Sequence, residues 1–176
     1  MTATILDGRV MSGRILGRLR HEVEGFVSDH GRAPVLATVL VGEDPASRTY
    51  VRMKANRCAE VGIRSRRVEL DSDTTTVTLV GQIRQLCDDP SVDGILLQHP
   101  VPGHIDERAA LEAITPTKDV DGVTRTSFAE MALGVGGFQA ATPGGIMALL
   151  DAYAIQLAGR HAVVVGPLRQ DQVRQD

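Results

Sequence analysis

The chain alternates short apolar runs with longer amphipathic segments. The runs 35–41 and 92–97 are mostly apolar, as is typical of strands buried on both faces of a sheet. Segment 63–70 is a third candidate strand, in which arginines at 64, 66 and 67 indicate a sheet edge. Apolar residues spaced near the helical period predict helices between these strands, over 9–30, 47–61, 75–87 and 106–114. This alternation predicts an α/β fold with a mostly parallel sheet and right-handed crossovers.

Polar and turn-forming segments follow the predicted strands at their carboxyl ends. Ligands of parallel sheets bind beyond that edge. Three segments fall there, 42–47, 98–102 and 118–122. The architecture therefore directs the search for a functional site to these segments before any chemistry is considered. Ser47, in the first of them, is the expected N-cap of the helix that ends at Val61.

The composition argues against several classes of function. The 176 residues carry 19 basic and 22 acidic side chains, a net charge of −3, with only 3% aromatics and no Trp. A nucleic-acid-binding surface needs a basic stripe and stacking aromatics, so none is expected. No apolar run approaches the roughly 20 residues of a membrane span, and the N-terminus lacks the pattern of a secretory signal. We therefore expect no nucleic-acid or membrane partner and a cytoplasmic protein.

Tyr50 and Lys54 are four residues apart, so they share one face of the predicted helix. A lysine that is buried beside other groups becomes a usable base near neutral pH, and a neighbouring tyrosine can orient or share a proton. The alternative is an exposed helix with an ordinary Tyr and Lys. Gln98 ends an apolar strand, where its carboxamide either donates and accepts hydrogen bonds in a site or simply faces solvent.

Two carboxylates, Asp119 and Asp121, lie in the segment 118–122. They could accept two donors from a planar heterocycle, belong to a metal site, or form a solvated turn. Two carboxylates without a third ligand make a poor metal site, so no metal is expected. The two cysteines, Cys58 and Cys87, are far apart and form neither a metal pattern nor a disulfide framework. They are predicted to be small buried apolar residues.

Four motifs in order make a more specific pattern than any one of them. They are Pro45-Ala46-Ser47-Arg-Thr-Tyr50-Val51-Arg52-Met53-Lys54, Asp93-Gly94-Ile-Leu-Leu97-Gln98-His99-Pro100-Val-Pro102, Lys118-Asp119-Val-Asp121-Gly122 and Thr142-Pro143-x-Gly145. This arrangement resembles the bifunctional methylenetetrahydrofolate dehydrogenase/cyclohydrolase family (FolD), over roughly residues 1–166. The resemblance implies a three-layer, parallel-sheet catalytic domain over 1–125. A linker, a helix and the first strand of an incomplete Rossmann-type NADP-binding domain would follow over 126–166, with that strand at 161–165.

The family resemblance also implies an activity. NADP would take a hydride from 5,10-methylenetetrahydrofolate, and water would then open the resulting 5,10-methenyl cation to 10-formyltetrahydrofolate. The implied cofactor is NADP, the implied partners are one-carbon derivatives of tetrahydrofolate, and the implied assembly is a homodimer.

Residue roles follow from the same resemblance by motif position. Lys54 would be the central acid/base group, and Tyr50 would stack on or orient the folate. Gln98 would hold Lys54, and Asp121 would bind the amino group and ring nitrogens of the pterin. These four are the expected catalytic residues. The other residues expected to bind substrate are Val51, Arg52, Met53, Leu97 and His99.

The sequence departs from the family in several places. His99 stands where the family usually has an aliphatic residue, Ala141 replaces a common cysteine, and Val123-Thr124-Arg125 replaces a Phe-His-Pro stretch. Gly166 is the one residue expected to contact NADP, because the family continues from it with Arg-Ser and a further glycine. Here 167–176 has no glycine, and Pro167 removes a backbone donor.

The mismatched tail predicts a C-terminally truncated chain, as a frameshift or gene-model error would produce. Segment 167–176 is then a polar tail outside the family pattern. Three readings stay open: the full folate activity, a catalytically defective folate-binding fragment, or cyclohydrolase activity alone.

Overall fold

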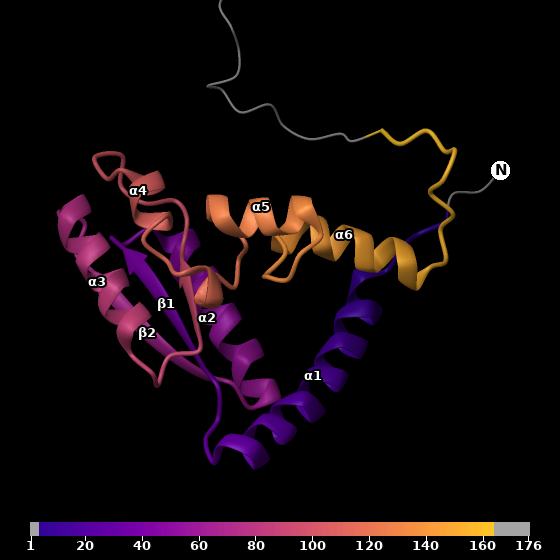
Figure 1. Cartoon of the computed structure of the whole chain (residues 1–176), viewed down its shortest axis with the longest axis horizontal. Coiled ribbons are helices and arrows are strands. Elements are labelled where there is room, and N and C mark those ends of the chain that lie inside the picture. The colour runs from indigo at the N-terminus through magenta and orange to yellow at the C-terminus, as the bar shows by residue number, and fades with distance from the viewer. Residues whose placement is uncertain (1–3, 164–176) are drawn as a thin grey trace, which may run out of the picture.

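The computed structural model describes residues 4–163, which form an α/β fold (Figure 1). Three parallel strands have the order β2-β1-β3. The strands are β1 (Val35–Val41), β2 (Arg64–Leu70) and β3 (Gly94–Leu97). The helices are α1 (Gly8–His30), α2 (Pro45–Val61), α3 (Thr76–Asp88), α4 (Glu107–Leu111), the 3-10 turn η1 (Pro116–Lys118), α5 (Arg125–Leu133) and α6 (Ala141–Ala152). The predicted fold class and parallel sheet are confirmed.

The central strand β1 is covered on both faces, which gives three layers. Ala37, Val39 and Val41 belong to a core cluster with the buried side chains of α3 and β3. On the other face, α2 packs on β1 and β2 and buries Val51 and Val61. Figure 1 shows α2 and α3 on opposite sides of the strands. Because β1 is enclosed in this way, its position favours a mostly apolar run, in which Thr38 is the one polar residue.

Strand β2 is the edge of the sheet, as its arginines predicted. It pairs with β1 in register from Val35↔Arg64 to Val41↔Leu70. Its first four residues are exposed. Arg66 Nη1 lies 2.6 Å from Asp89 Oδ2 at the end of α3. Charged side chains on an edge strand discourage pairing with unrelated chains.

The start of α2 differs from the sequence prediction. The N-cap is Asp44 rather than Ser47: the Asp44 carboxylate accepts the Ser47 amide at 2.7 Å, and Pro45 occupies the first turn. This hydrogen bond lowers the pKa of Asp44. A carboxylate is a strong cap and proline suits the first helical position, so the helix begins two residues before the predicted cap.

Other boundaries also shift. Strand β3 begins at Gly94 rather than at 92, and α4 ends at Leu111 although 106–114 was predicted. The turn-rich segment 115–126 predicts a loop, but it contains η1, and α5 begins inside it at Arg125. Residues 161–163 have no regular secondary structure. The rest of the strand predicted over 161–165, together with Gly166 and 167–176, lies outside the described residues.

The last helices pack back toward the first one. Helix α6 contacts α1, and the hydroxyl of Tyr153 accepts the Asp7 amide at 2.8 Å. Figure 1 shows α5 and α6 leading from the sheet to the N-terminal end of α1. The division into segments 1–125 and 126–166 stays a prediction. Within residues 4–163, no helix combines the length and apolar character needed to cross a membrane.

A charged pair joins the starts of β1 and β3. Both terminal nitrogens of Arg32 donate to the Asp93 carboxylate at 2.7 Å, and the same carboxylate accepts the Val35 amide at 2.7 Å. The hydrogen bonds from Arg32 hold the pKa of Asp93 below its ordinary value, against the opposing effect of partial burial. The ionised form of Asp93 therefore stabilises the fold.

Asp93→Asn should lower the free energy of unfolding at pH 7 by about 1 kcal/mol, because it removes a charge-assisted, two-point contact. A lowered folded-state pKa contributes stability above the unfolded value near 4. That contribution is lost as pH falls through the folded value. Urea unfolding between pH 7 and pH 3 checks both effects, with Asp73→Asn at an exposed turn as the control. Equal pH profiles for the variant and the unsubstituted chain would contradict this role of Asp93.

Candidate active site

Helix α2 and strand β3 bring Lys54 and Gln98 together. Lys54 Nζ donates to Gln98 Oε1 at 3.2 Å. Gln98 directly follows β3 and is only 7% exposed, while Lys54 is half-buried. The two residues are 44 positions apart in sequence, so the contact arises from the packing of α2 on the sheet. The structure therefore joins two of the residues that the sequence singled out through an amine–carboxamide hydrogen bond.

The orientation of the Gln98 carboxamide follows from its neighbours. Lysine can only donate, so Oε1 faces Lys54 and Nε2 points the other way, donating to the backbone oxygen of His99 at 2.7 Å. The Ser47 hydroxyl lies 3.3 Å from the same oxygen and donates to it. Ser47 is buried. It was expected to be a helix cap and instead belongs to the surroundings of the pair.

The remaining predicted residues of α2 and β3 have different environments. Tyr50 and Met53 are 54% and 50% exposed, and Arg52 is exposed as well, so all three are open to a ligand. Val51 and Leu97 are 4% and 2% exposed and pack in the interior. The roles of all five in binding substrate stay predictions.

The two carboxylates of segment 118–122 have separate roles. Asp119 is fully buried. It accepts the Ser127 hydroxyl at 2.7 Å, the Thr124 amide at 2.9 Å and the Val123 amide at 3.3 Å. Burial acts to raise the pKa of Asp119, but these hydrogen bonds outweigh it, and the pKa lies below its ordinary value. The carboxylate oxygens of Asp119 therefore accept hydrogen bonds from within the protein, and these bonds anchor the start of α5.

Asp121 is half-buried, and its carboxylate makes no hydrogen bond within residues 4–163. Gly122, the next residue, has φ +64°, and a Cβ there would lie 2.7 Å from the Ala140 nitrogen. A larger residue would therefore strain this turn and push it away from the segment before α6. This close approach holds the loop in place and leaves Asp121 as the carboxylate available to a ligand.

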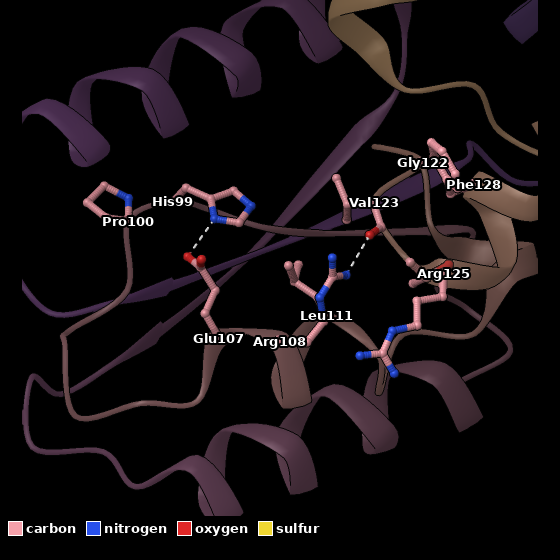
Figure 2. A pocket seen from close by; sticks show the side chains of 10 residues that line it. His99, Pro100, Glu107, Arg108, Leu111, Gly122, Val123, Arg125 and Phe128 are labelled. Carbon is pink, nitrogen blue, oxygen red and sulfur yellow. Dashed lines mark hydrogen bonds and ion pairs between the residues drawn. The ribbon is translucent and has the colours of Figure 1, made fainter. Parts of the chain in front are cut away.

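A cleft of about 1030 Å³ lies next to the pair (Figure 2). His99 Nδ1 is 2.7 Å from Glu107 Oε1 on one wall, and Arg108 donates to the backbone oxygen of Val123 at 3.1 Å on another. Neither Lys54 nor Gln98 lines this cleft, which meets the pair only at residue 99. The lining residues are His99, Pro100, Glu107, Arg108, Leu111, Gly122, Val123, Thr124, Arg125 and Phe128.

Metal-ligating side chains do not gather in the described part of the chain. Within residues 4–163, no group of three or more His, Cys, Asp or Glu side chains is placed to hold a metal ion. Cys58 is buried, Cys87 is partly buried, and both are free thiols. Cys87 instead takes part in backbone contacts, with its sulfur 3.4 Å from the Thr115 nitrogen.

A family model described as "Tetrahydrofolate dehydrogenase/cyclohydrolase, catalytic domain" matches residues 6–121. The chain belongs to this family. The matched region contains β1, β2, β3 and the pair of Lys54 with Gln98. The expected resemblance is thereby confirmed.

Relatives in the tetrahydrofolate dehydrogenase/cyclohydrolase family match most of the chain. Bifunctional protein FolD 1 of Salinispora arenicola is 62% identical over 166 residues, which are 94% of this chain and 60% of that protein. The crystal structure of the bifunctional enzyme FolD from Campylobacter jejuni superposes with a TM-score of 0.83 at 42% identity. That match covers 86% of this chain and 54% of the Campylobacter chain.

The FolD of Trypanosoma brucei, whose structure is a complex with NADP cofactor and inhibitor, superposes with a TM-score of 0.84 at 31% identity. That match covers 90% of this chain and 55% of the Trypanosoma chain. The chain therefore spans about three-fifths of the length of its curated relatives and about half that of the solved structures.

The sequence did not predict that Ser47 and Glu107 contact His99 beside the pair. Ser47 lies seven residues before Lys54, two helical turns along the same face, so its helical position was a usable signal. Glu107 had no such signal, because its contact with His99 joins a loop to a separate short helix. Tertiary packing alone brings these two side chains together.

The different environments of Asp119 and Asp121 can be tested by measuring the free energy of unfolding of variants. Asp119→Asn should lower the free energy of unfolding by about 1–3 kcal/mol, since an amide nitrogen would face buried donors. Asp121→Asn is the matched control and should change it by less than about 0.5 kcal/mol. Urea unfolding of both variants measures the difference. Equal losses would contradict the assignment of Asp119 as the structural carboxylate.

Proposed function

We propose that this protein acts in tetrahydrofolate one-carbon interconversion. It would oxidise 5,10-methylenetetrahydrofolate with NADP and hydrolyse the 5,10-methenyl product to 10-formyltetrahydrofolate. The observation that carries the proposal is the pair of Lys54 with the buried Gln98 in a chain of this family. The pair supplies a basic amine that is held from one side and open to a ligand on others.

The hydrolytic step needs no nicotinamide, so the described residues bear on it directly. Bound NADP would accept the hydride in the oxidative step. Gly166, the residue predicted to contact NADP, lies outside residues 4–163, and no part of the oxidative step is derived from it. NADP as the specific cofactor is thus proposed from the family, in which the Trypanosoma relative was solved with that cofactor.

Lys54 would act as the base in hydrolysis. The water oxygen adds to the methenyl carbon, and Lys54 Nζ takes a proton from that water. The Lys54 proton passes to N5 as the bond from this carbon to N5 breaks. The hydroxyl on the carbon gives its own proton to Lys54 and becomes the formyl carbonyl, which stays on N10, and Lys54 then releases this proton to solvent. A cationic ligand beside Lys54 favours its uncharged form because like charges repel. Gln98 accepts one Lys54 hydrogen and so directs the rest of the amine toward the ligand.

Asp121 and Tyr50 would bind the rest of the substrate. The Asp121 carboxylate has acceptor oxygens unused within residues 4–163, and a pterin offers an amino group and a ring N–H that match two acceptors. Tyr50 is 54% exposed and presents a ring on the same helix as Lys54. Arg52, Met53 and His99 are the other predicted binding residues accessible from solvent.

We further propose a homodimer that acts in the cytoplasm. In the described part of the chain no strand pairs with the outer edge of β2, which leaves backbone groups for a second copy. The free thiols of Cys58 and Cys87 fit a reducing compartment.

Lys54→Met tests the chemical step. It should lower kcat for hydrolysis of 5,10-methenyltetrahydrofolate by about 10²–10⁴, the usual contribution of a general base. The measurement is the steady-state rate for the purified 176-residue chain. Arg57→Met, an exposed position on α2 that pairs with Glu60, is the control and should retain activity. An unchanged rate for Lys54→Met would refute the role of Lys54. A chain that binds folate and hydrolyses nothing would support the alternative of a folate-binding fragment.

Asp121→Asn tests substrate binding separately. It should weaken the binding of tetrahydrofolate about tenfold, or about 1.4 kcal/mol, because one acceptor becomes a donor facing the pterin N–H groups. Isothermal titration calorimetry on the full chain gives the dissociation constant. Asp151→Asn, an exposed residue of α6, is the matched control. Equal affinities for both variants would remove Asp121 from the binding site.

A further inference from the structure

We propose that His99 and Glu107 are positioning residues that hold the pair of Lys54 and Gln98 in its working orientation. They act on the pair through the backbone of residue 99, in addition to any contact that the His99 ring makes with substrate. The catalytic importance of this arrangement rests on the proposed function. The arrangement itself rests on four contacts between described residues.

The contacts form a continuous path from α4 to α2. Glu107 Oε1 is 2.7 Å from His99 Nδ1, and the His99 backbone oxygen accepts Gln98 Nε2 at 2.7 Å. Gln98 Oε1 then accepts Lys54 Nζ at 3.2 Å. Ser47 Oγ reaches the same His99 oxygen at 3.3 Å. The His99 carbonyl group is therefore the point at which the path meets α2 a second time.

The backbone at Glu107, where the path begins, is held in place by its neighbours. Glu107 begins α4, whose next residues Ala110 and Leu111 are 0% and 7% exposed in the core. The preceding residue, Asp106, caps α4 by accepting the Ala109 amide at 2.9 Å, and its own amide donates to Thr76 Oγ1 at 2.9 Å. The backbone that carries Glu107 is thus held by the core and by α3, although the side chain itself is part-exposed.

The chemical groups of His99 and Glu107 decide which of the two residues donates the hydrogen bond between them. An ionised carboxylate only accepts, so His99 Nδ1 carries the hydrogen and donates it. This contact anchors the His99 ring at the wall of the cleft, as Figure 2 shows. A residue held by its ring has less backbone freedom, and its carbonyl oxygen then keeps the direction that Gln98 Nε2 requires. If that oxygen turns away, the Gln98 amide loses the partner that keeps Oε1 toward Lys54.

The sequence offers a direct probe of this path. It contains two lysines, Lys54 and Lys118. Lys118 Nζ donates to the backbone oxygens of Leu86, Cys87 and Asp89, none of which belongs to the path. Lysine labelled with ¹³C at the ε carbon therefore gives two side-chain NMR signals, one at the pair and one as an internal reference. A held lysine shows two distinct ε-proton shifts, and a freely rotating one shows a single averaged shift.

The experiment uses the labelled 176-residue chain with the variants Glu107→Ala, His99→Leu and Glu107→Gln. The first two should lose the separation of the Lys54 ε-proton shifts. Glu107→Gln retains an acceptor oxygen and should keep the separation, which a role of the charge alone would not predict. The Lys118 signal should stay unchanged in all three variants.

Unchanged Lys54 signals in both Glu107→Ala and His99→Leu would overturn the proposal. Parallel changes at Lys118 would also overturn it, because they would indicate a general loosening of the fold. The measurement needs neither folate nor turnover. An inactive chain would refute the proposed function without affecting this test, and a failed NMR result would leave the Lys54 hydrolysis experiment intact.

Discussion

The pairing of β1 with strands on both sides is the constraint on which the site depends. β1 pairs in parallel with β2 along its whole length and with β3 from Leu36↔Gly94 to Val39↔Leu97. Parallel pairing puts the carboxyl ends of all three strands at one edge, where the turn before α2 and Gln98 then meet. Lys54 reaches that edge because α2 starts there and runs back across the sheet. A single β-bridge between Ile95 and Asp119 attaches the 118–122 loop to β3.

The fold could be predicted from the sequence because buried and exposed positions of a strand favour different residue types. The enclosed β1 is apolar except for Thr38, and the edge strand β2 carries charged side chains, so both were predicted from their residue types. Element ends were less predictable. Asp44 and Ser47 are both good caps, and the helix began at Asp44 because Pro45 fits the first turn. Asp93 lies in the predicted strand, yet its carboxylate is taken up by Arg32 and Val35, and regular pairing starts one residue later.

The candidate site was predictable in its parts and only partly in its geometry. Lys54 and Gln98 were identified by position and motif, and the structure brings them together. The residue pattern alone did not separate the two aspartates at 119 and 121, because alternate residues of a loop carry no burial signal, and only the family resemblance selected Asp121. Their difference depends on donors from α5 that reach only Asp119. The contact of His99 with Glu107 likewise depends on how α4 packs against the core.

We propose that a folate binds at Lys54, Gln98 and Asp121 rather than in the neighbouring cleft of about 1030 Å³. A crystal structure of this chain with a stable analogue of 5,10-methenyltetrahydrofolate tests it most directly. The account predicts the pterin within hydrogen-bond distance of the Asp121 carboxylate, with its one-carbon group beside Lys54 Nζ. A pterin bound between His99, Arg108 and Phe128, away from Lys54, would contradict it.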